Sequence, residues 1–267
     1  MSLYLKYFKL RIISFLQYRT AALSGLMTQF FWGLMLIFIY VAFYSNAGEL
    51  DVVSLPQIVT YIWLQQAFFA FLYVRINDEE IASLIKSGDV AYEIVRPYNL
   101  YFWWYIKMIA KRVSAGVLRF LPVLLLAFLL PEPYKLSLPS SIPNFILFVI
   151  SLCLGIFLVT SFNMLVYTIG FYTYNQTGIS QIINSFIELL SGAMIPVMLL
   201  PNFIQKATYY LPFRLITDLP YRIYSNNIGI SEGIMSIGLQ IIWIFIFIWI
   251  GDLIVKKSLK KVFVQGG

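Results

Sequence analysis

The sequence predicts an all-α integral membrane protein, and three observations lead to this fold class. First, 60% of the 267 residues are hydrophobic and only 12% are charged, whereas about 25% of the residues in a soluble domain are charged. Second, the apolar residues gather in six runs of roughly the length that crosses a bilayer. Third, the basic residues collect at alternate ends of these runs. We therefore expect one transmembrane domain over residues 1–267.

The six apolar runs predict six transmembrane helices. A bilayer core of about 30 Å needs about 20 helical residues, because each residue advances a helix by about 1.5 Å. The predicted spans cover residues 21–44, 58–74, 105–130, 145–173, 180–200 and 230–255. The first run is too long for the core of a cleaved signal peptide, so we interpret it as an uncleaved anchor. Six spans put both termini on one side.

The positions of Lys and Arg predict which side holds the termini. Basic residues in short loops and at span ends are retained in the cytoplasm. If both termini face inward, 14 of the 19 basic residues lie on the inner side, and Arg119 lies within the third span. Only Lys135, Lys206, Arg214 and Arg222 then lie outside. We therefore predict that both termini are cytoplasmic.

The two terminal segments each have two interpretations. A helix before residue 20 would place Leu5, Phe8 and Ile12 on one face, which suits a helix lying on the inner leaflet. Alternatively, this segment simply begins the first span. The lysines within residues 256–261 either meet anionic membrane lipids or serve only as a stop-transfer anchor.

The cytoplasmic segment between the second and third spans predicts a short amphipathic helix at about residues 78–88. Asn77 is the expected N-cap, and the three carboxylates that follow suit the positive end of a helix. Ile81, Leu84 and Ile85 then share one face. This apolar stripe must be buried, either in a groove of a partner protein or on the membrane surface. We favour a protein partner, because anionic lipid would repel the carboxylates.

The outer segment at residues 201–227 is too apolar for a solvated loop, and its three prolines interrupt any span. It predicts a pair of short helices that dip into the outer interface. Arg214, Asp218 and Arg222 follow one another at a spacing of four. They would share one helical face if Pro220 does not break the helix.

Two charged residues fall within the predicted spans, where a charge is costly unless it is paired or hydrated. Glu188 and Arg119 lie at similar depths, so a buried ion pair between them is one interpretation. Alternatively, Glu188 lines a polar pathway, or it is protonated and hydrogen-bonded within the bundle. Gln66 and Asn184 would add polar lining, although each also suits ordinary hydrogen bonding between helices.

The composition excludes several kinds of chemistry. With no histidine, the chain has no imidazole base or imidazole metal ligand. Its single cysteine, Cys153, cannot form an internal disulfide, and we expect it to be a small core residue. No G-x-x-x-x-G-K-[ST] phosphate loop is present. The basic excess flanks the spans, so it does not indicate nucleic-acid binding. We expect no catalytic residues, no metal ligands and no cofactor in this chain.

Several sequence strings, taken in order, resemble one known family. They are residues 17–22 (QYRTAA), 26–33 (LMTQFFWG), 60–67 (TYIWLQQA), 87–93 (SGDVAYE) with Arg96-Pro97, 190–196 (LSGAMIP), 211–214 (LPFR), 219–225 (LPYRIYS) and 264–267 (VQGG). Together with the six predicted spans and the short cytoplasmic helix, they resemble the bacterial ABC type-2 (ABC-2 family) transporter permeases of roughly 260 residues. The resemblance covers essentially the whole chain.

The resemblance implies a permease subunit of an ATP-driven exporter in the bacterial plasma membrane. Such a subunit works as a dimer, with itself or with a related second permease. It also works with an ABC ATPase subunit that binds ATP and Mg²⁺. In this family the ATPase docks on the helix between spans two and three. The implied coupling contacts are Glu80, Leu84, Ile85, Lys86 and Asp89.

The resemblance also implies that spans one, two and five form the dimer contact and the transport path. Gln66, Asn184 and Glu188 are then candidates for the path, with Arg119 as a further polar residue in the membrane. The family handles drugs, peptides, lipids and glycans, and the sequence does not select among them. Rival classes are a non-transporting sensor or scaffold subunit, a membrane-embedded enzyme and a passive channel. The scattered outer carboxylates argue against an enzyme, and the lack of a regular polar stripe argues against a channel.

Overall fold

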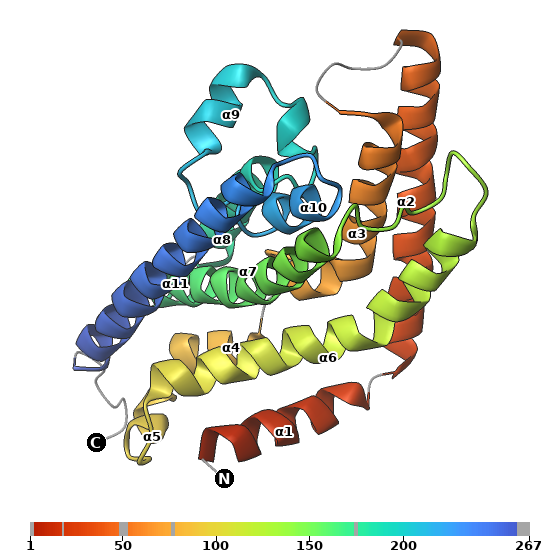
Figure 1. The fold of residues 1–267 in the computed structure, drawn as a ribbon. Coiled ribbons are helices and arrows are strands. Elements are labelled where there is room, and N and C mark those ends of the chain that lie inside the picture. The colour runs from red at the N-terminus through yellow and green to blue at the C-terminus, as the bar shows by residue number, and fades with distance from the viewer. Residues whose placement is uncertain (1–2, 18, 48–52, 76–77, 174–175, 261–267) are drawn as a thin grey trace.

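The computed structural model describes residues 3–17, 19–47, 53–75, 78–173 and 176–260. Every regular element in these ranges is a helix, which confirms the all-α fold class (Figure 1). The elements are α1 (Leu3–Leu16), α2 (Arg19–Ala47), α3 (Leu55–Leu72), α4 (Glu79–Ser87), α5 (Val90–Ile94), α6 (Leu100–Leu129), α7 (Ile142–Ile169), α8 (Gln176–Leu190), the 3₁₀ turn η1 (Val197–Leu199), α9 (Asn202–Thr208), α10 (Asp218–Tyr224) and α11 (Ile230–Leu259). Asn77 and the string at 264–267 lie outside the described residues.

Five helices in the described part of the chain are long and apolar enough to cross a membrane, namely α2, α3, α6, α7 and α11. They coincide with five of the six predicted runs. The run at 180–200 differs, because α8 ends at Leu190 and has only 15 residues. Such a helix is about 22 Å long, which is shorter than a bilayer core. Gly192 follows with φ of 81°, a left-handed conformation that favours glycine and ends the helix.

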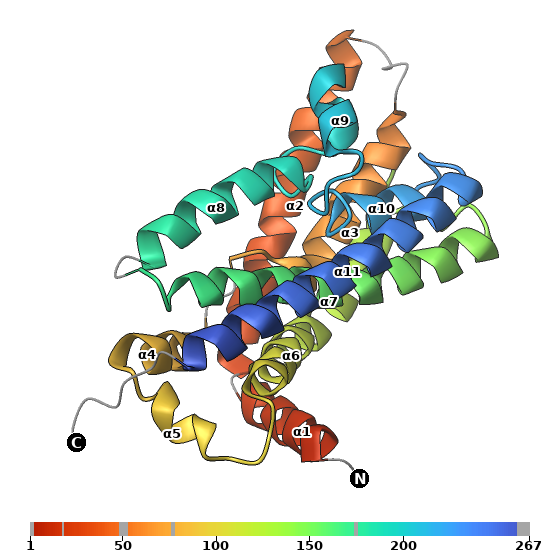
Figure 2. The same ribbon diagram turned by 90° about the vertical axis from the view of Figure 1, so that its left-hand side faces the viewer.

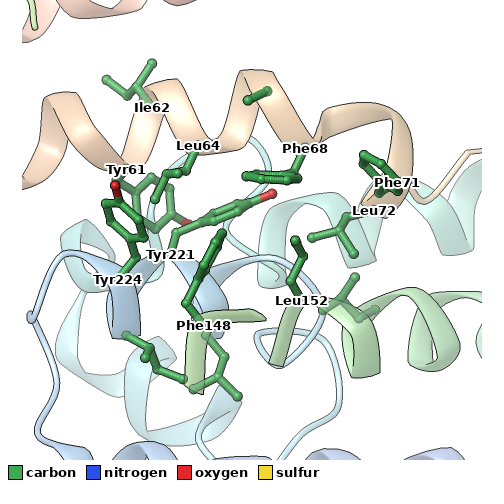
Figure 3. Packing of buried hydrophobic residues seen from close by; sticks show 14 of the residues in the cluster. Tyr61, Ile62, Leu64, Phe68, Phe71, Leu72, Phe148, Leu152, Tyr221 and Tyr224 are labelled. Carbon is green, nitrogen blue, oxygen red and sulfur yellow. The ribbon is translucent and has the colours of Figure 1, made fainter. Parts of the chain in front are cut away.

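Helix α3 forms the centre of the bundle, and 78% of its span is buried. One face of α3 packs on α7 and α10 through a cluster of aromatic rings (Figure 3). The ring of Phe68 lies 5.5 Å from that of Phe148 on α7, and Tyr61 lies 5.4 Å from Tyr221 on α10. Burial of such large rings supplies much of the packing energy of a helical bundle. The core therefore joins helices that are far apart in the sequence.

The segment at residues 201–227 forms two short helices, as predicted, but they differ in burial. Helix α9 is largely exposed, with Phe203 72% accessible, whereas every residue of α10 is buried or nearly so. Figures 1 and 2 show α10 tucked against α3 and α11, with α9 at the periphery. Asp218 and Arg222 both lie on α10, as expected, and they form an ion pair at 3.5 Å. Arg214 precedes α10, so it does not share a helical face with them.

Helix α1 is a separate helix and does not continue into α2. It lies alongside α6 in both views (Figures 1 and 2). The ring of Tyr7 stacks on that of Trp103 in α6, with 3.6 Å between the ring centres. The expectation of a separate N-terminal helix is therefore met, and contact with the inner leaflet stays a prediction. Cys153, expected in the core, is instead exposed on α7.

Candidate functional site

The helix between α3 and α6 begins one residue later than the sequence suggested. Helix α4 starts at Glu79 and its N-cap is Asp78, whose carboxylate accepts a hydrogen bond from the backbone N–H of Ile81 at 3.1 Å. The prediction that Asn77 is the N-cap was therefore wrong. Gly88 ends the helix with φ of 81°. Asp78 is a suitable cap, because a carboxylate pairs with the free N–H groups and the positive dipole at that end.

The apolar stripe of α4 is buried within the chain itself. Ile81 is 1% exposed and Ile85 is 9% exposed, and Leu84 packs at the edge of the same cluster. The residues that cover the stripe come from α6, α7 and α11. They include Tyr101, Trp104, Met108, Tyr167 and Val255. Neither interpretation of the stripe, a partner groove or the membrane surface, was right, because the bundle itself supplies the groove.

The opposite face of α4 is polar and exposed. It carries Glu79, Ser83 and Lys86, and Asp89 follows just after the helix. This face borders a cleft of about 700 Å³, whose other wall is the connection from α7 to α8, including Phe171. Lys86 forms no hydrogen bond or ion pair with the described residues. Of the five implied coupling residues, Glu80, Lys86 and Asp89 are exposed, whereas Ile85 faces inward.

Helix α4 is fastened to α6 and α1 by a cluster of charges. Lys107 of α6, which is 3% exposed, contacts Asp78 at 2.7 Å and Glu80 at 2.5 Å. Arg11 of α1 contacts Glu80 at 3.2 Å. Burial alone would raise the pKa of Glu80. The hydrogen bond from Lys107 and the charges of Lys107 and Arg11 outweigh that effect, so the pKa lies below its ordinary value of 4.5.

The cytoplasmic end of α3, on the predicted orientation, is held by a fully buried arginine. Arg112 of α6 is 0% exposed, and its Nη1 donates hydrogen bonds to the carbonyls of Phe71 and Tyr73 at 3.1 and 2.7 Å. Its Nη2 donates to the side chain of Asn163 on α7. A cation at this end also suits the negative pole of the α3 dipole. The chain leading from α3 to α4 is thus fixed to α6 and α7.

Glu188 has a partner, but the partner is Arg75 rather than Arg119. The guanidinium of Arg75 donates two hydrogen bonds to the Glu188 carboxylate, each at 2.6 Å, and another to the hydroxyl of Ser185 at 3.1 Å. The hydrogen bond to Glu188 raises the pKa of Arg75. The paired arrangement considered for Arg119 and Glu188 is therefore wrong. This ion pair instead joins the end of α3 to α8.

The structure does not bring the four expected intramembrane polar residues together. Asn184 lines a cavity of about 480 Å³ near Arg75, between α3, α4, α7 and α8. Gln66 lines a different cavity of about 340 Å³ between α2, α3 and the turn after α8. Arg119 packs on α2, where a side chain at Gly25 would collide with its guanidinium. These residues therefore do not form one continuous site.

Three residues at these places escaped the sequence analysis. Arg75 and Lys107 were counted only as charges at span ends, and no local pattern names their partners on other helices. Gln29 of α2 lines the same cavity as Gln66. It is 5% exposed, and neither polar atom of its amide has a hydrogen-bond partner among the described residues. A glutamine in a strongly apolar run was the one signal available.

The fold and this site define a class of protein. The chain is an all-α, multi-pass membrane protein whose short helix between two long ones is exposed along a polar face and fastened into the bundle. The chain belongs to the ABC-2 family of transporter proteins, whose family model matches residues 30–266. No curated protein matches the sequence. Members of this family are transmembrane subunits rather than ATPases, and they work with an ABC ATPase subunit. The chain is therefore a permease subunit of an ABC transporter.

Proposed function

We propose that this permease is the membrane subunit of an ATP-driven exporter and that a separate ATPase binds the polar face of α4. In this proposal α8 and the residues that follow it, up to η1, together make the sixth crossing, so both termini are cytoplasmic. The membrane is the bacterial plasma membrane. ATP and Mg²⁺ are bound by the ATPase, and the cargo is a drug, peptide, lipid or glycan. The permease pairs with a second copy of itself or with a related permease.

The position of α4 is the observation that carries the proposal. The helix exposes Glu79, Ser83 and Lys86 beside a cleft large enough to receive part of another protein. On its other side, the buried contact between Lys107 and Asp78 ties it to α6. A buried, hydrogen-bonded ion pair is costly to break. A force applied to α4 would therefore move α6 with it instead of deforming the loop.

A movement of α4 and α6 would be transmitted to α8 through the ion pair between Arg75 and Glu188. Arg75 lies shortly after the end of α3 at Leu72, and this end is fixed to α6 by Arg112. Arg75 is partly exposed, so this contact is easier to open than the buried one at Lys107. We infer that it acts as a latch between α3 and α8. The cavity lined by Asn184 lies beside the latch and would enlarge when it opens.

The exposed face of α2 supports a dimer. Only 17% of the α2 span is buried, compared with 78% for α3. Next to this face, Gln29 keeps both amide atoms unpartnered among the described residues, beside the cavity that Gln66 lines. An amide in a membrane is stabilised when a neighbouring helix offers hydrogen-bond partners. A second permease subunit against α2 would offer them.

The test is capture of the ATPase by a charge-reversal variant. Tagged chain is purified from native membranes in mild detergent, and stoichiometric companions are identified by mass spectrometry. We expect the unaltered chain to recover an ABC ATPase and Lys86→Glu to recover about tenfold less, because the new carboxylate opposes the charge pattern of the interface. Lys135→Glu is the matched control, since Lys135 is also exposed but lies in the loop after α6. The yield and thermal stability of both variants should stay unchanged.

Recovery of no ATPase by the intact chain would contradict the proposal as a whole. Equal recovery by the chain and by Lys86→Glu, with transport intact, would contradict the docking face on α4. Substitutions at Ile85 are unsuitable for this test. Ile85 is buried against α6, so Ile85→Asp would disturb the bundle whether or not an ATPase binds nearby.

A further inference from the structure

A second pocket lies far from α4, among η1, α9, the turn that follows α9, α10 and the start of α11. Its volume is about 410 Å³, and its walls include Lys206, Tyr209, Arg214, Arg222 and Glu232. Figures 1 and 2 show α9 and the start of α11 at the opposite end of the molecule from α4. This outer pocket has no part in the coupling proposed above.

The charges of the outer pocket do not cancel. Three basic side chains, Lys206, Arg214 and Arg222, line it together with one carboxylate, Glu232. Neither Lys206 nor Glu232 forms an ion pair with a described residue. Arg222 is partly balanced by Asp218, at 3.5 Å. The pocket as a whole therefore carries excess positive charge.

Arg214 is the most informative of the three basic residues. It is 1% exposed, and its guanidinium lies 4.4 Å from the ring centre of Tyr209. Its Nε donates to the carbonyl of Tyr209 at 2.9 Å, and its Nη2 donates to the hydroxyl of Ser236 at 3.2 Å. Its Nη1 has no hydrogen-bond partner among the described residues. A buried donor without a partner is costly, and an oxygen of a ligand would satisfy it.

The sequence adds an independent argument. On the predicted orientation only four basic residues lie on the outer side, and three of them line this one pocket. Positive charge is rare on that side of membrane proteins. Three of the four are gathered in this one pocket, and two of these three are buried or nearly buried guanidinium groups. This concentration of positive charge indicates a ligand of opposite charge.

We propose that the outer pocket binds a phosphate-type anion, held by Arg214, Arg222 and Lys206. Guanidinium groups bind phosphate oxygens through paired, charge-assisted hydrogen bonds, and an ammonium adds a point charge. The anion is either the headgroup of a phospholipid or free phosphate. The exposed ring of Tyr210 in the pocket wall favours the headgroup, since it is 65% exposed and tyrosine rings gather at the level of lipid headgroups.

The test measures anion binding by the purified full-length chain in a neutral detergent. The probes are phosphatidylglycerol, with zwitterionic phosphatidylcholine as the comparison of zero net charge, and inorganic phosphate. Binding is read by native mass spectrometry for the lipids and by the shift in thermal unfolding for all three. We expect phosphatidylglycerol to bind at least tenfold more tightly than phosphatidylcholine, because the basic pocket repels the choline cation beside the phosphate of the second lipid.

The variants are Lys206→Gln and Arg222→Gln, with Lys135→Gln as the matched control. Lys135 is exposed, belongs to the same predicted side and lies outside the pocket. We expect the two pocket variants to weaken anion binding about tenfold and the control to bind as the unaltered chain does. Arg222 also contacts Asp218 and Asn227, so its variant can lose stability. The ammonium of Lys206 makes no ion pair or hydrogen bond with the described residues. Its variant should therefore stay folded, so that a change in anion binding can be assigned to the lost charge.

Each outcome decides the matter. Selective binding of phosphatidylglycerol that depends on Lys206 supports the headgroup form of the proposal. Binding of inorganic phosphate alone, with the same dependence, supports the free-anion form. Equal binding by Lys206→Gln and the unaltered chain, or an equal loss in Lys135→Gln, would overturn it. The assay contains no ATPase, so its result is independent of the proposed function.

Discussion

The two ends of the molecule use charge in opposite ways. Beside α4, Lys107 contacts both Asp78 and Glu80, and Glu80 also contacts Arg11, so each charge of this cluster meets an opposite one. In the outer pocket, Lys206 and Glu232 have no such contacts among the described residues, and Arg214 keeps a donor unused. Charges that are paired within the chain hold its helices together. Charges that line a pocket and have no partner among the described residues indicate a ligand.

Burial accounts for this difference. The side chains of Lys107 and Asp78 are 3% and 5% exposed, so they can exist in the bundle only as a pair. Lys206 is exposed, so water solvates it and the fold does not need to supply a partner. Substitutions at Lys107 or Asp78 should therefore change stability, whereas those at Lys206 should change only binding.

The largest expected effect is the loss of Lys107. Lys107→Met leaves the buried carboxylate of Asp78 without its main partner, and we expect about 3–5 kcal/mol of destabilisation. Lys111→Met is the control, because the side chain of Lys111 is 31% exposed and its ammonium lies 3.9 Å from the Asp78 carboxylate. It should cost less than half as much. Thermal and denaturant unfolding in detergent would measure both losses, and equal losses would contradict the comparison.

The ion pair between Arg75 and Glu188 should contribute less. A double-mutant cycle with Arg75→Gln and Glu188→Gln should give a coupling energy of about 1–2 kcal/mol, since the contact is bidentate but Arg75 is 37% exposed. The surface pair of Lys256 and Asp252, with Lys256 60% exposed, should give about 0.3–0.5 kcal/mol. A double-mutant cycle with Arg119→Gln and Glu188→Gln should give no coupling energy. Coupling between Glu188 and Arg119 would contradict the geometry described above.

The smallest effect is a dependence of stability on pH that comes from Glu80. Its pKa in the folded chain lies below 4.5, so its ionised form favours the folded state above the unfolded pKa. That contribution is lost as the pH falls through the folded pKa. The difference in melting temperature between the unaltered chain and Glu80→Gln should be constant from pH 7 to about pH 5 and shrink below about pH 4.5. A difference that grows on acidification would contradict this assignment.

Hydrophobic runs predicted most of the fold, because long apolar segments have few alternatives to crossing a bilayer as helices. The exception was the run at 180–200. Its composition is as apolar as a span, yet the turn at Gly192 is fixed by tertiary contacts. The carbonyl of Gly192 accepts hydrogen bonds from Tyr61 and Gln65 of α3. Those contacts cross more than a hundred residues, and no local pattern contains them.

The candidate site was predicted in part. The helical spacing of the apolar residues predicted α4 and its apolar stripe, because both are properties of one segment. It could not tell whether a partner, lipid or the chain itself covers Ile81 and Ile85. In the same way, the charge of Glu188 was evident, but its partner depends on where α3 ends relative to α8. Such pairings are properties of the assembled bundle.

The placement of α10 has a consequence for how the protein is made. Helix α3 has the lowest mean hydropathy of the five long helices, and Tyr61 hydrogen-bonds to Asp218, 157 residues further along the chain. During synthesis α3 must enter the membrane long before that partner exists. The hydroxyl of Tyr61 therefore has no native partner until the last third of the chain is made. The centre of the bundle can pack only after nearly all of the protein has left the ribosome. The native centre of this permease is thus a product of late assembly rather than of sequential insertion.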